Sequence, residues 1–223
     1  MFPVSDVIPS RTRPVVTIVL IAMNLMAFLY ELQMSGRELR VLAHTYGVVP
    51  AVFEWRSLLT SLFLHAGWLH LGGNMLYLWI FGDNVEDRLG RLRFALFYVA
   101  CGVAAALAQV ATNPRSATPM IGASGAIAGI MGAYFVLYPR SRVLTAVFLI
   151  VYLDLIEIPA IVFLGIWFVM QLFSGVGSLG AQTADGGIAF LAHVGGFIAG
   201  AATGAYVRVR ERSLRAYWLK SGS

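Results

Sequence analysis

The sequence contains few charged residues: Asp, Glu, Lys and Arg make up 12% of its 223 residues, whereas 59% are hydrophobic. Soluble globular domains average about 25% charged residues, so a soluble fold of ordinary composition is excluded for most of the chain. Cysteine is equally scarce, because Cys101 is the only one. An intramolecular disulfide is therefore impossible. Because Cys101 lies in an apolar run, we interpret it as a small core or lipid-facing residue.

Lysine is almost absent, since fifteen of the sixteen basic residues are arginine. The formal net charge of +5 could suggest a nucleic-acid partner. The arginines, however, stand in short clusters between apolar runs, which is the pattern that orients membrane proteins. We therefore expect the lipid bilayer, and no nucleic acid, as the partner. The first apolar run is too long for the core of a signal peptide and lacks a convincing cleavage site, which predicts a retained helix.

Six apolar segments approach the roughly 20 residues that a membrane-spanning helix needs. They are residues 15–32, 62–81, 94–112, 122–138, 158–173 and 188–207. The long apolar stretch 143–173 is interrupted by Asp154, Glu157 and Pro159. Because proline disfavours helix in the residue before it, the fifth span is expected to begin near 158. Residues 143–157 are then expected to form a partly buried connection.

Six spans place both chain ends on one side of the membrane. That side would hold twelve basic residues and the other side four: Arg11, Arg13, Arg88, Arg91, Arg93, Arg140, Arg142, Arg208, Arg210, Arg212, Arg215 and Lys220 against Arg37, Arg40, Arg56 and Arg115. Basic residues favour the cytoplasmic side, so both ends are predicted to lie inside. The predicted fold is an all-α polytopic membrane protein, a six-helix transmembrane bundle with its N- and C-termini inside.

The domain organisation follows from these spans. We expect a cytoplasmic tail at 1–13, a membrane domain at 14–208 and a basic cytoplasmic tail at 209–223. Two external loops belong to the membrane domain. The loop 33–61 is long enough to have structure of its own, and the loop 174–187 is rich in glycine and expected to be mobile.

A few polar residues inside the spans share one depth. His70 and Asn74 lie on the second span, Ser124 on the fourth and His193 on the sixth, each 14 to 18 residues before an inner arginine cluster. At about 1.5 Å per residue they lie about 21–27 Å from the inner boundary, which is several ångströms below the outer face of a core about 30 Å thick. Ionisable residues at such depth are expensive and usually functional.

Glycines predict which spans touch. The fourth span carries Gly125, Gly129 and Gly132, and the sixth carries Gly196, Gly200 and Gly204. Small residues at this spacing let helix backbones approach closely. If these faces pack together, Ser124 and His193 can come within hydrogen-bond distance, the arrangement required of a nucleophile and its base.

Each of these residues also has a structural alternative. A serine in a glycine-rich helix can be a packing residue, a histidine inside a span can be a structural donor or part of a proton relay, and His70 and Asn74 can link helices. A zinc site is not expected, because His65 and His70 are five residues apart and no HExxH motif occurs. No metal or other cofactor is predicted.

Four motifs, taken in order, resemble those of the rhomboid intramembrane serine proteases. They are Trp55-Arg56 in the first external loop, His65-x4-His70-x3-Asn74, Gly122-Ala-Ser-Gly125, and Ala192-His193-x2-Gly196-x3-Gly200. The matching region covers about 55–204, most of the chain. The resemblance is to the minimal six-span bacterial form, which implies a multi-pass protein of the bacterial inner membrane with its active site open to the extracytoplasmic side.

The resemblance also implies residue roles. Ser124 would be the nucleophile and His193 the base, with His70, Asn74 and the Ser124 backbone N–H forming an oxyanion hole. The remaining matches would be structural: Trp55, Arg56, His65, Gly122, Gly125, Gly196 and Gly200. The loop 174–187 would be a mobile cap. One departure stands out: many family members carry an aromatic residue four positions after the serine, stacked on the catalytic imidazole, and here that residue is Ala128.

The expected activity is cleavage of transmembrane protein substrates by a Ser-His dyad. No acidic residue lies near His193 in its span, so no third member of a triad is expected. Two other functions are considered: a catalytically silent relative that binds membrane clients, and a proton-coupled transporter that uses the histidines. The transporter would need polar groups spread through the bilayer, whereas these lie toward one side. The sequence predicts neither the physiological substrate nor the oligomeric state.

Overall fold

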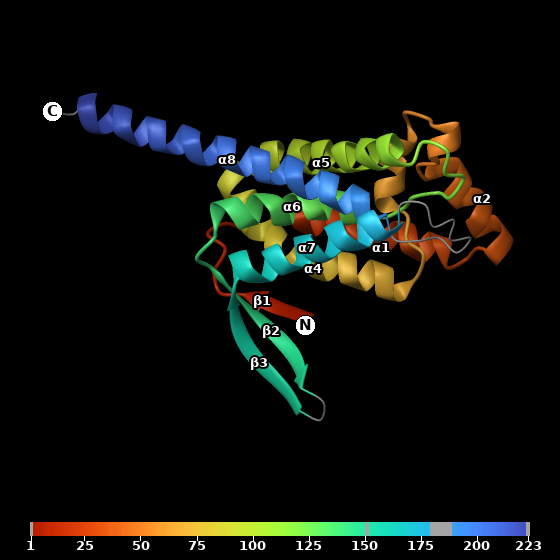
Figure 1. The fold of residues 1–223 in the computed structure, drawn as a ribbon, viewed down its shortest axis with the longest axis horizontal. Helices are drawn as coiled ribbons and strands as arrows, with labels where there is room; N and C mark the ends of the chain where they lie inside the picture. The colour runs from red at the N-terminus through yellow and green to blue at the C-terminus, as the bar shows by residue number, and fades with distance from the viewer. Residues whose placement is uncertain (1, 150–151, 179–188, 222–223) are drawn as a thin grey trace.

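The computed structural model describes residues 2–149, 152–178 and 189–221 and is mostly helical. Its helices are α1 (Val15–Glu31), α2 (Gly36–Tyr46), α3 (Ser57–Thr60), α4 (Trp68–Leu89), α5 (Arg91–Thr112), α6 (Ser124–Leu137), α7 (Ala160–Ser178) and α8 (Phe190–Ser221), with two short 3-10 turns, η1 (Pro50–Val52) and η2 (Ser61–Phe63). Figure 1 shows α1 and α4–α8 side by side as a bundle, with α2 at one end and the strands projecting from its side near the other end.

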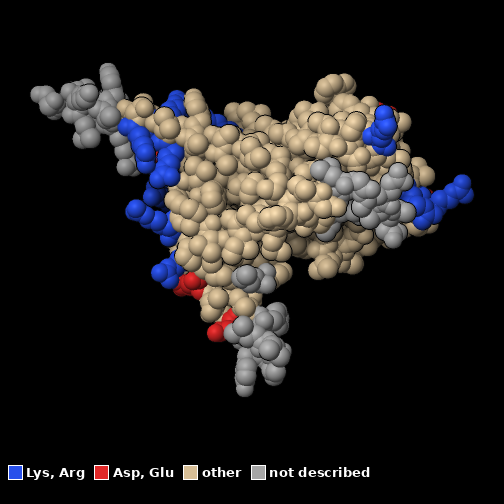
Figure 2. All heavy atoms as spheres, viewed as in Figure 1, with Lys and Arg blue, Asp and Glu red and all other residues tan. Residues whose placement is uncertain are grey.

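Three helices, α5, α7 and α8, are long and apolar enough to cross a membrane, and α1 and α6 are shorter apolar helices. The helix α4 has the length but carries polar residues along it, including His70, Asn74 and Asp83. Figure 2 shows basic side chains gathered at the two ends of the molecule, with a band of other residues between them. This distribution is that of a helical membrane protein. The count of six spans and their orientation stay predictions.

A small antiparallel sheet departs from the predicted all-α class. The strands β1 (Phe2–Asp6), β2 (Arg142–Leu149) and β3 (Tyr152–Pro159) pair in the order β1-β2-β3. The prediction of an all-α protein is therefore wrong for this part of the chain, where 143–157 was expected to be a connection. Both hairpin strands are rich in the branched and aromatic residues that favour strands. The connection is partly buried as expected, since Val143 is fully buried whereas Leu155 is 54% exposed.

The N-terminal segment packs against the C-terminal end of α4. Glu86 is buried and accepts hydrogen bonds from the backbone N–H of Val16 and Thr17 and from the Thr17 hydroxyl at 2.8–2.9 Å. A carboxylate at the start of a helix satisfies N–H groups that have no partner within the helix. Glu86 thereby fixes the start of α1 against α4.

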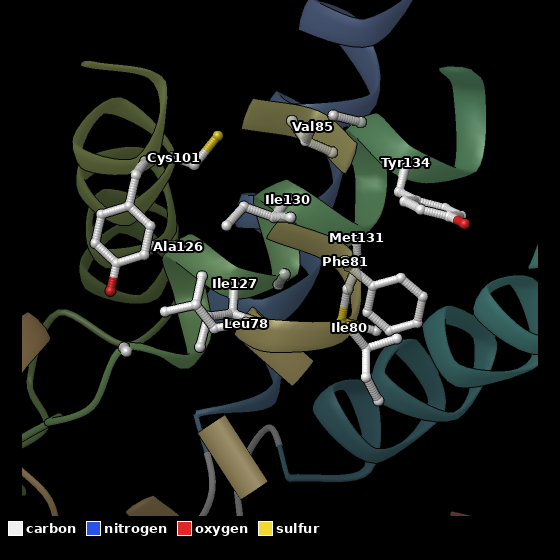
Figure 3. Close-up of a cluster of buried hydrophobic side chains, with 14 of the residues drawn as sticks. Leu78, Ile80, Phe81, Val85, Cys101, Ala126, Ile127, Ile130, Met131 and Tyr134 are labelled. Atoms are coloured by element: carbon white, nitrogen blue, oxygen red, sulfur yellow. The ribbon is translucent and has the colours of Figure 1, made fainter. Parts of the chain in front are cut away.

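The core lies between α4, α5 and α6. Figure 3 shows Leu78 and Phe81 of α4 near Ile127 and Met131 of α6, and Cys101 of α5 belongs to the same buried cluster. Cys101 is buried, so of its two interpretations, a core residue or a lipid-facing one, the structure supports the core residue.

The helices α6 and α8 cross at their glycines. A Cβ atom at Gly196 would overlap the carbonyl oxygen of Gly125, and one at Gly200 would overlap the backbone of Gly129. Only glycine permits this approach, as the small-residue pattern predicted. Both helices begin at the end of the bundle near α2 and run toward the end with the sheet (Figure 1). Their first turns therefore lie at the same end of the molecule.

The segment 33–61, which was predicted to be an external loop, is ordered and reaches the segment before α6. It contains α2, which starts with a capping box between Ser35 and Glu38, followed by η1 and α3. The backbone of Val48 pairs with Met120 through two hydrogen bonds of 2.8 and 2.9 Å. This pairing holds the segment that leads into α6.

Candidate active site

Ser124 and His193 lie within hydrogen-bond distance of each other. The His193 Nε2 atom is 2.8 Å from the Ser124 Oγ atom, although the two residues are 69 positions apart. Ser124 is the first residue of α6, and His193 lies in the first turn of α8. The close glycine crossing of these two helices brings the side chains together. The contact is the one that the glycine pattern predicted.

Gly122 shapes the turn before Ser124. Its φ angle is +116°, a conformation that other L-residues rarely adopt, and its N–H donates to the Ser61 carbonyl over 2.8 Å. A Cβ atom added at Gly122 would lie 2.7 Å from the His70 Nε2 atom. The glycine is therefore required by both its backbone conformation and the space that His70 occupies. The turn ends at Ser124, whose backbone N–H, like the others in the first turn of a helix, has no acceptor within that helix.

His70 and Asn74 approach the same turn from α4. The hypothetical Gly122 Cβ position lies 3.6 Å from the Asn74 Nδ2 atom, so both side chains converge two residues before Ser124. The Asn74 Nδ2 atom is buried and has no hydrogen-bond partner among the described residues. Burying an amide without a partner costs about 2–7 kcal/mol, depending on the reference state. A donor kept free at this position has the character of a binding group.

A cavity of about 820 Å³ connects these groups. Its wall includes His70, Asn74, Gly122, Ser124, Trp167 and His193, together with apolar side chains such as those of Trp68 and Leu69. A mostly apolar cavity with a few convergent polar groups is typical of a binding or active site.

Several residues of the family motifs lie outside the cavity wall, and among them are Trp55, Arg56 and His65. Trp55 is 74% exposed and packs edge-to-face on Phe53, and Arg56 pairs with Glu54 at 2.6 Å. His65 is buried, and its backbone N–H donates to the Glu31 carboxylate over 3.2–3.3 Å. The structural roles expected of Trp55, Arg56 and His65 stay predictions.

The predicted cap, residues 174–187, is only partly visible. Its first five residues, 174–178, belong to the end of α7, and the remainder lies outside the described residues. The expectation that this loop covers the site stays a prediction.

Two residues at the site escaped the sequence analysis. The Gln171 Oε1 atom on α7 is 2.7 Å from the His193 Nδ1 atom. The ring of Trp167, one turn earlier, lies 5.9 Å from the imidazole between centroids, with 34° between the planes. The expectation that the dyad has no third triad member concerned acidic side chains, so it did not anticipate an amide beside His193. The available signal was that Gln171 is the one amide or charged residue in the apolar run 160–173.

The sequence matches a known protein family. A family model described as the rhomboid domain matches residues 52–210, well over half of the chain. The chain belongs to the rhomboid family. As a rhomboid protein with several apolar helices, it is an integral membrane protein.

Two relatives of this rhomboid chain are named as proteases. "Rhomboid protease GluP" of Bacillus subtilis (strain 168) is 33% identical over 197 residues, which cover 86% of this chain and 35% of that protein. "Putative rhomboid protease YdcA" of the same organism is 34% identical over 125 residues, covering 56% of this chain and 62% of that protein. "Rhomboid protein 1, mitochondrial" of Saccharomyces cerevisiae is 30% identical over 170 residues, covering 72% and 45%. The chain thus spans 35–62% of the length of these relatives.

Proposed function

We propose that the chain is an intramembrane serine endopeptidase that cleaves transmembrane proteins with a dyad of Ser124 and His193. The observation that carries the proposal is the 2.8 Å contact between the His193 Nε2 and Ser124 Oγ atoms at the wall of the cavity. Family membership and the protease names of two relatives support the same activity. The first turn of α6 and that of α8 supply the two groups.

The reaction begins at the dyad. His193 Nε2 takes the proton of the Ser124 hydroxyl while Ser124 Oγ attacks the carbonyl carbon of the substrate peptide bond. The tetrahedral intermediate then collapses, the C–N bond breaks, and the proton on His193 passes to the leaving amine. A water molecule, activated by His193 in the same way, hydrolyses the acyl-enzyme and restores the Ser124 hydroxyl.

The oxyanion of the intermediate needs donors fixed in place before the reaction. We propose the Asn74 amide, the His70 imidazole and the Ser124 backbone N–H for this role. The unpartnered, buried Asn74 Nδ2 atom supports it, because the donor is held at the site with no competing acceptor among the described residues. The dipole of α6 also favours negative charge at Ser124, since this residue begins the helix.

Water and an extended substrate backbone must both reach the dyad. The cavity offers space for water, and a substrate segment must unwind there because a helix engages its own carbonyl groups. We propose six spans with both termini inside, and a site open to the extracytoplasmic side of a bacterial inner membrane. The arginine distribution supports this orientation.

Labelling with a fluorophosphonate tests the enzyme proposal against a silent relative and a transporter. The purified protein in detergent is expected to react at Ser124, identified by mass spectrometry of the modified peptide. The His193→Ala variant should react much more slowly, because the serine loses its base. Absence of any adduct on folded wild-type protein would refute the proposed function.

A further inference from the structure

The second nitrogen of the candidate base has a partner of its own. The Gln171 Oε1 atom lies 2.7 Å from His193 Nδ1, on the opposite side of the imidazole from Ser124. Gln171 comes from α7, a helix that contributes no nucleophile, base or oxyanion donor. The imidazole is therefore bridged between α6 and α7 by one contact at each nitrogen.

The two contacts together select one tautomer of His193. A neutral imidazole carries one N–H and one acceptor nitrogen. If the Gln171 carbonyl oxygen accepts a hydrogen bond, the proton is on Nδ1, and the Nε2 lone pair is free to accept the Ser124 proton. The opposite tautomer would donate from Nε2 and could not act as a base toward Ser124.

The surroundings of His193 also show what lies against its imidazole, given that residue 128 is alanine and not aromatic. The resemblance leads one to expect a stacked aromatic ring at that position, but Ala128 is fully buried and has only a methyl group. Trp167 lies beside the imidazole instead, and it precedes Gln171 by one helical turn. Ring and amide thus come from the same face of α7 and limit both the tilt and the rotation of the imidazole.

We propose that Gln171 is a positioning residue, which orients His193 and fixes its reactive tautomer through the Nδ1–H bond. This inference rests on the proposed function of Ser124 and His193. An amide suits the apolar run of α7, since it accepts the hydrogen bond without placing a charge there. The helix itself is weakly enclosed: 22% of its apolar window is buried, against 39% for α5. The competence of the base then depends on how α7 packs against α8.

The test compares Gln171→Ala, Gln171→Glu and Met170→Ala in the full-length protein. Met170 is the neighbouring residue on α7 and is 60% exposed, so its variant reports on general disturbance of the helix. The readouts are kcat and KM for a single-span model substrate, thermal unfolding, and ¹⁵N chemical shifts of the histidine rings. The chain has four histidines, so a histidine-labelled sample gives few signals.

We expect Gln171→Ala to lower kcat at least tenfold with KM changed less than threefold. Its His193 ring should shift from the Nδ1–H tautomer toward a mixture of tautomers. Gln171→Glu keeps an acceptor and should keep the Nδ1–H tautomer, whereas Met170→Ala should match the wild type in kcat and in spectrum.

Wild-type kcat in Gln171→Ala would overturn the proposal. So would an equal loss in Met170→Ala, or a loss in Gln171→Ala without a tautomer change, because each assigns the effect to the helix as a whole. If the wild type proves inactive, the proposed function fails on its own. The tautomer comparison then still decides whether Gln171 positions His193.

Discussion

Asn74 lies in an environment that packing alone does not explain. Its amide nitrogen is buried on α4 and has no partner among the described residues, although most buried polar groups in proteins are hydrogen-bonded. The cost of this arrangement is offset if the amide gains an acceptor during catalysis. Gly122 contributes in the complementary way, by leaving room for His70 and turning the chain toward Ser124.

Asn74→Ala is expected to lower kcat by tens to hundreds of times. Removing one oxyanion donor in a serine protease costs roughly 3–4 kcal/mol in the barrier. Labelling of Ser124 by a fluorophosphonate should persist, since nucleophile and base remain. Asn24→Ala removes a buried amide on α1 outside the cavity wall and controls for a general loss of stability. Normal turnover in the Asn74 variant would show that α4 does not stabilise the oxyanion.

Among the elements, the pair α6 and α8 determines the geometry of the dyad. Their glycines meet backbone to backbone. The short distance between Ser124 and His193 therefore depends on glycine having no side chain at these positions.

In the sheet, by contrast, β1 is held by Asp6. Its carboxylate accepts hydrogen bonds from the Tyr134 hydroxyl at 2.6 Å and the Asn84 amide at 3.0 Å.

Gly200→Ala should destabilise the protein by about 1–3 kcal/mol or more, the usual cost of overpacking a core. The added methyl group would meet the backbone of Gly129, which cannot move aside as a flexible side chain can. Gly72→Ala on α4 is the matched control, because a Cβ atom there meets nothing within 4 Å. Thermal unfolding in detergent should distinguish the two, and equal stability would contradict the close crossing.

The stability contributed by β1 is expected to depend on pH through Asp6. Burial, together with the charge of Asp83, raises the pKa of Asp6 from its usual 3.8 to about 6, although the Tyr134 hydrogen bond opposes this. The folded state therefore binds the proton more tightly than the unfolded state. The stabilisation that the protonated Asp6 gives to the folded state is complete below about pH 4 and is lost as the pH rises through about 6.

Asp6→Asn should remove this dependence, since a neutral amide can occupy the site at any pH. The thermal stability of the variant relative to that of the wild type is expected to be higher at pH 7.5 than at pH 4, because only the wild type loses stability as the pH rises. The same difference at both pH values would mean that Asp6 does not bind a proton more tightly in the folded protein.

For the whole molecule, sequence patterns located the helices and the polar residues because both stand out in an apolar chain. Ser124, His193 and Asn74 interrupt apolar runs, and glycine spacing predicted which helices meet. Residues 142–159 were harder, since a short apolar segment cannot be assigned to strand or helix by periodicity alone. The pairing of β1 with β2 joins segments about 140 residues apart and left no local pattern.

Gln171 shows a second limit. Its partner lies 22 residues away on another helix, and its role depends on which face of α7 meets α8. The spacing of residues in the sequence does not predict which face of α7 packs against α8. A polar residue isolated in a span could have been noticed, but its partner could only come from the packed structure.

Cleavage of a single-span model substrate by the reconstituted protein tests the central claim most directly. Wild-type protein in liposomes should produce two fragments of the substrate. The Ser124→Ala variant should fold normally and produce none, because among the described residues Ser124 supplies the hydroxyl that contacts His193 Nε2. Cleavage by the Ser124→Ala variant at the wild-type rate would contradict the assignment of Ser124 as the nucleophile.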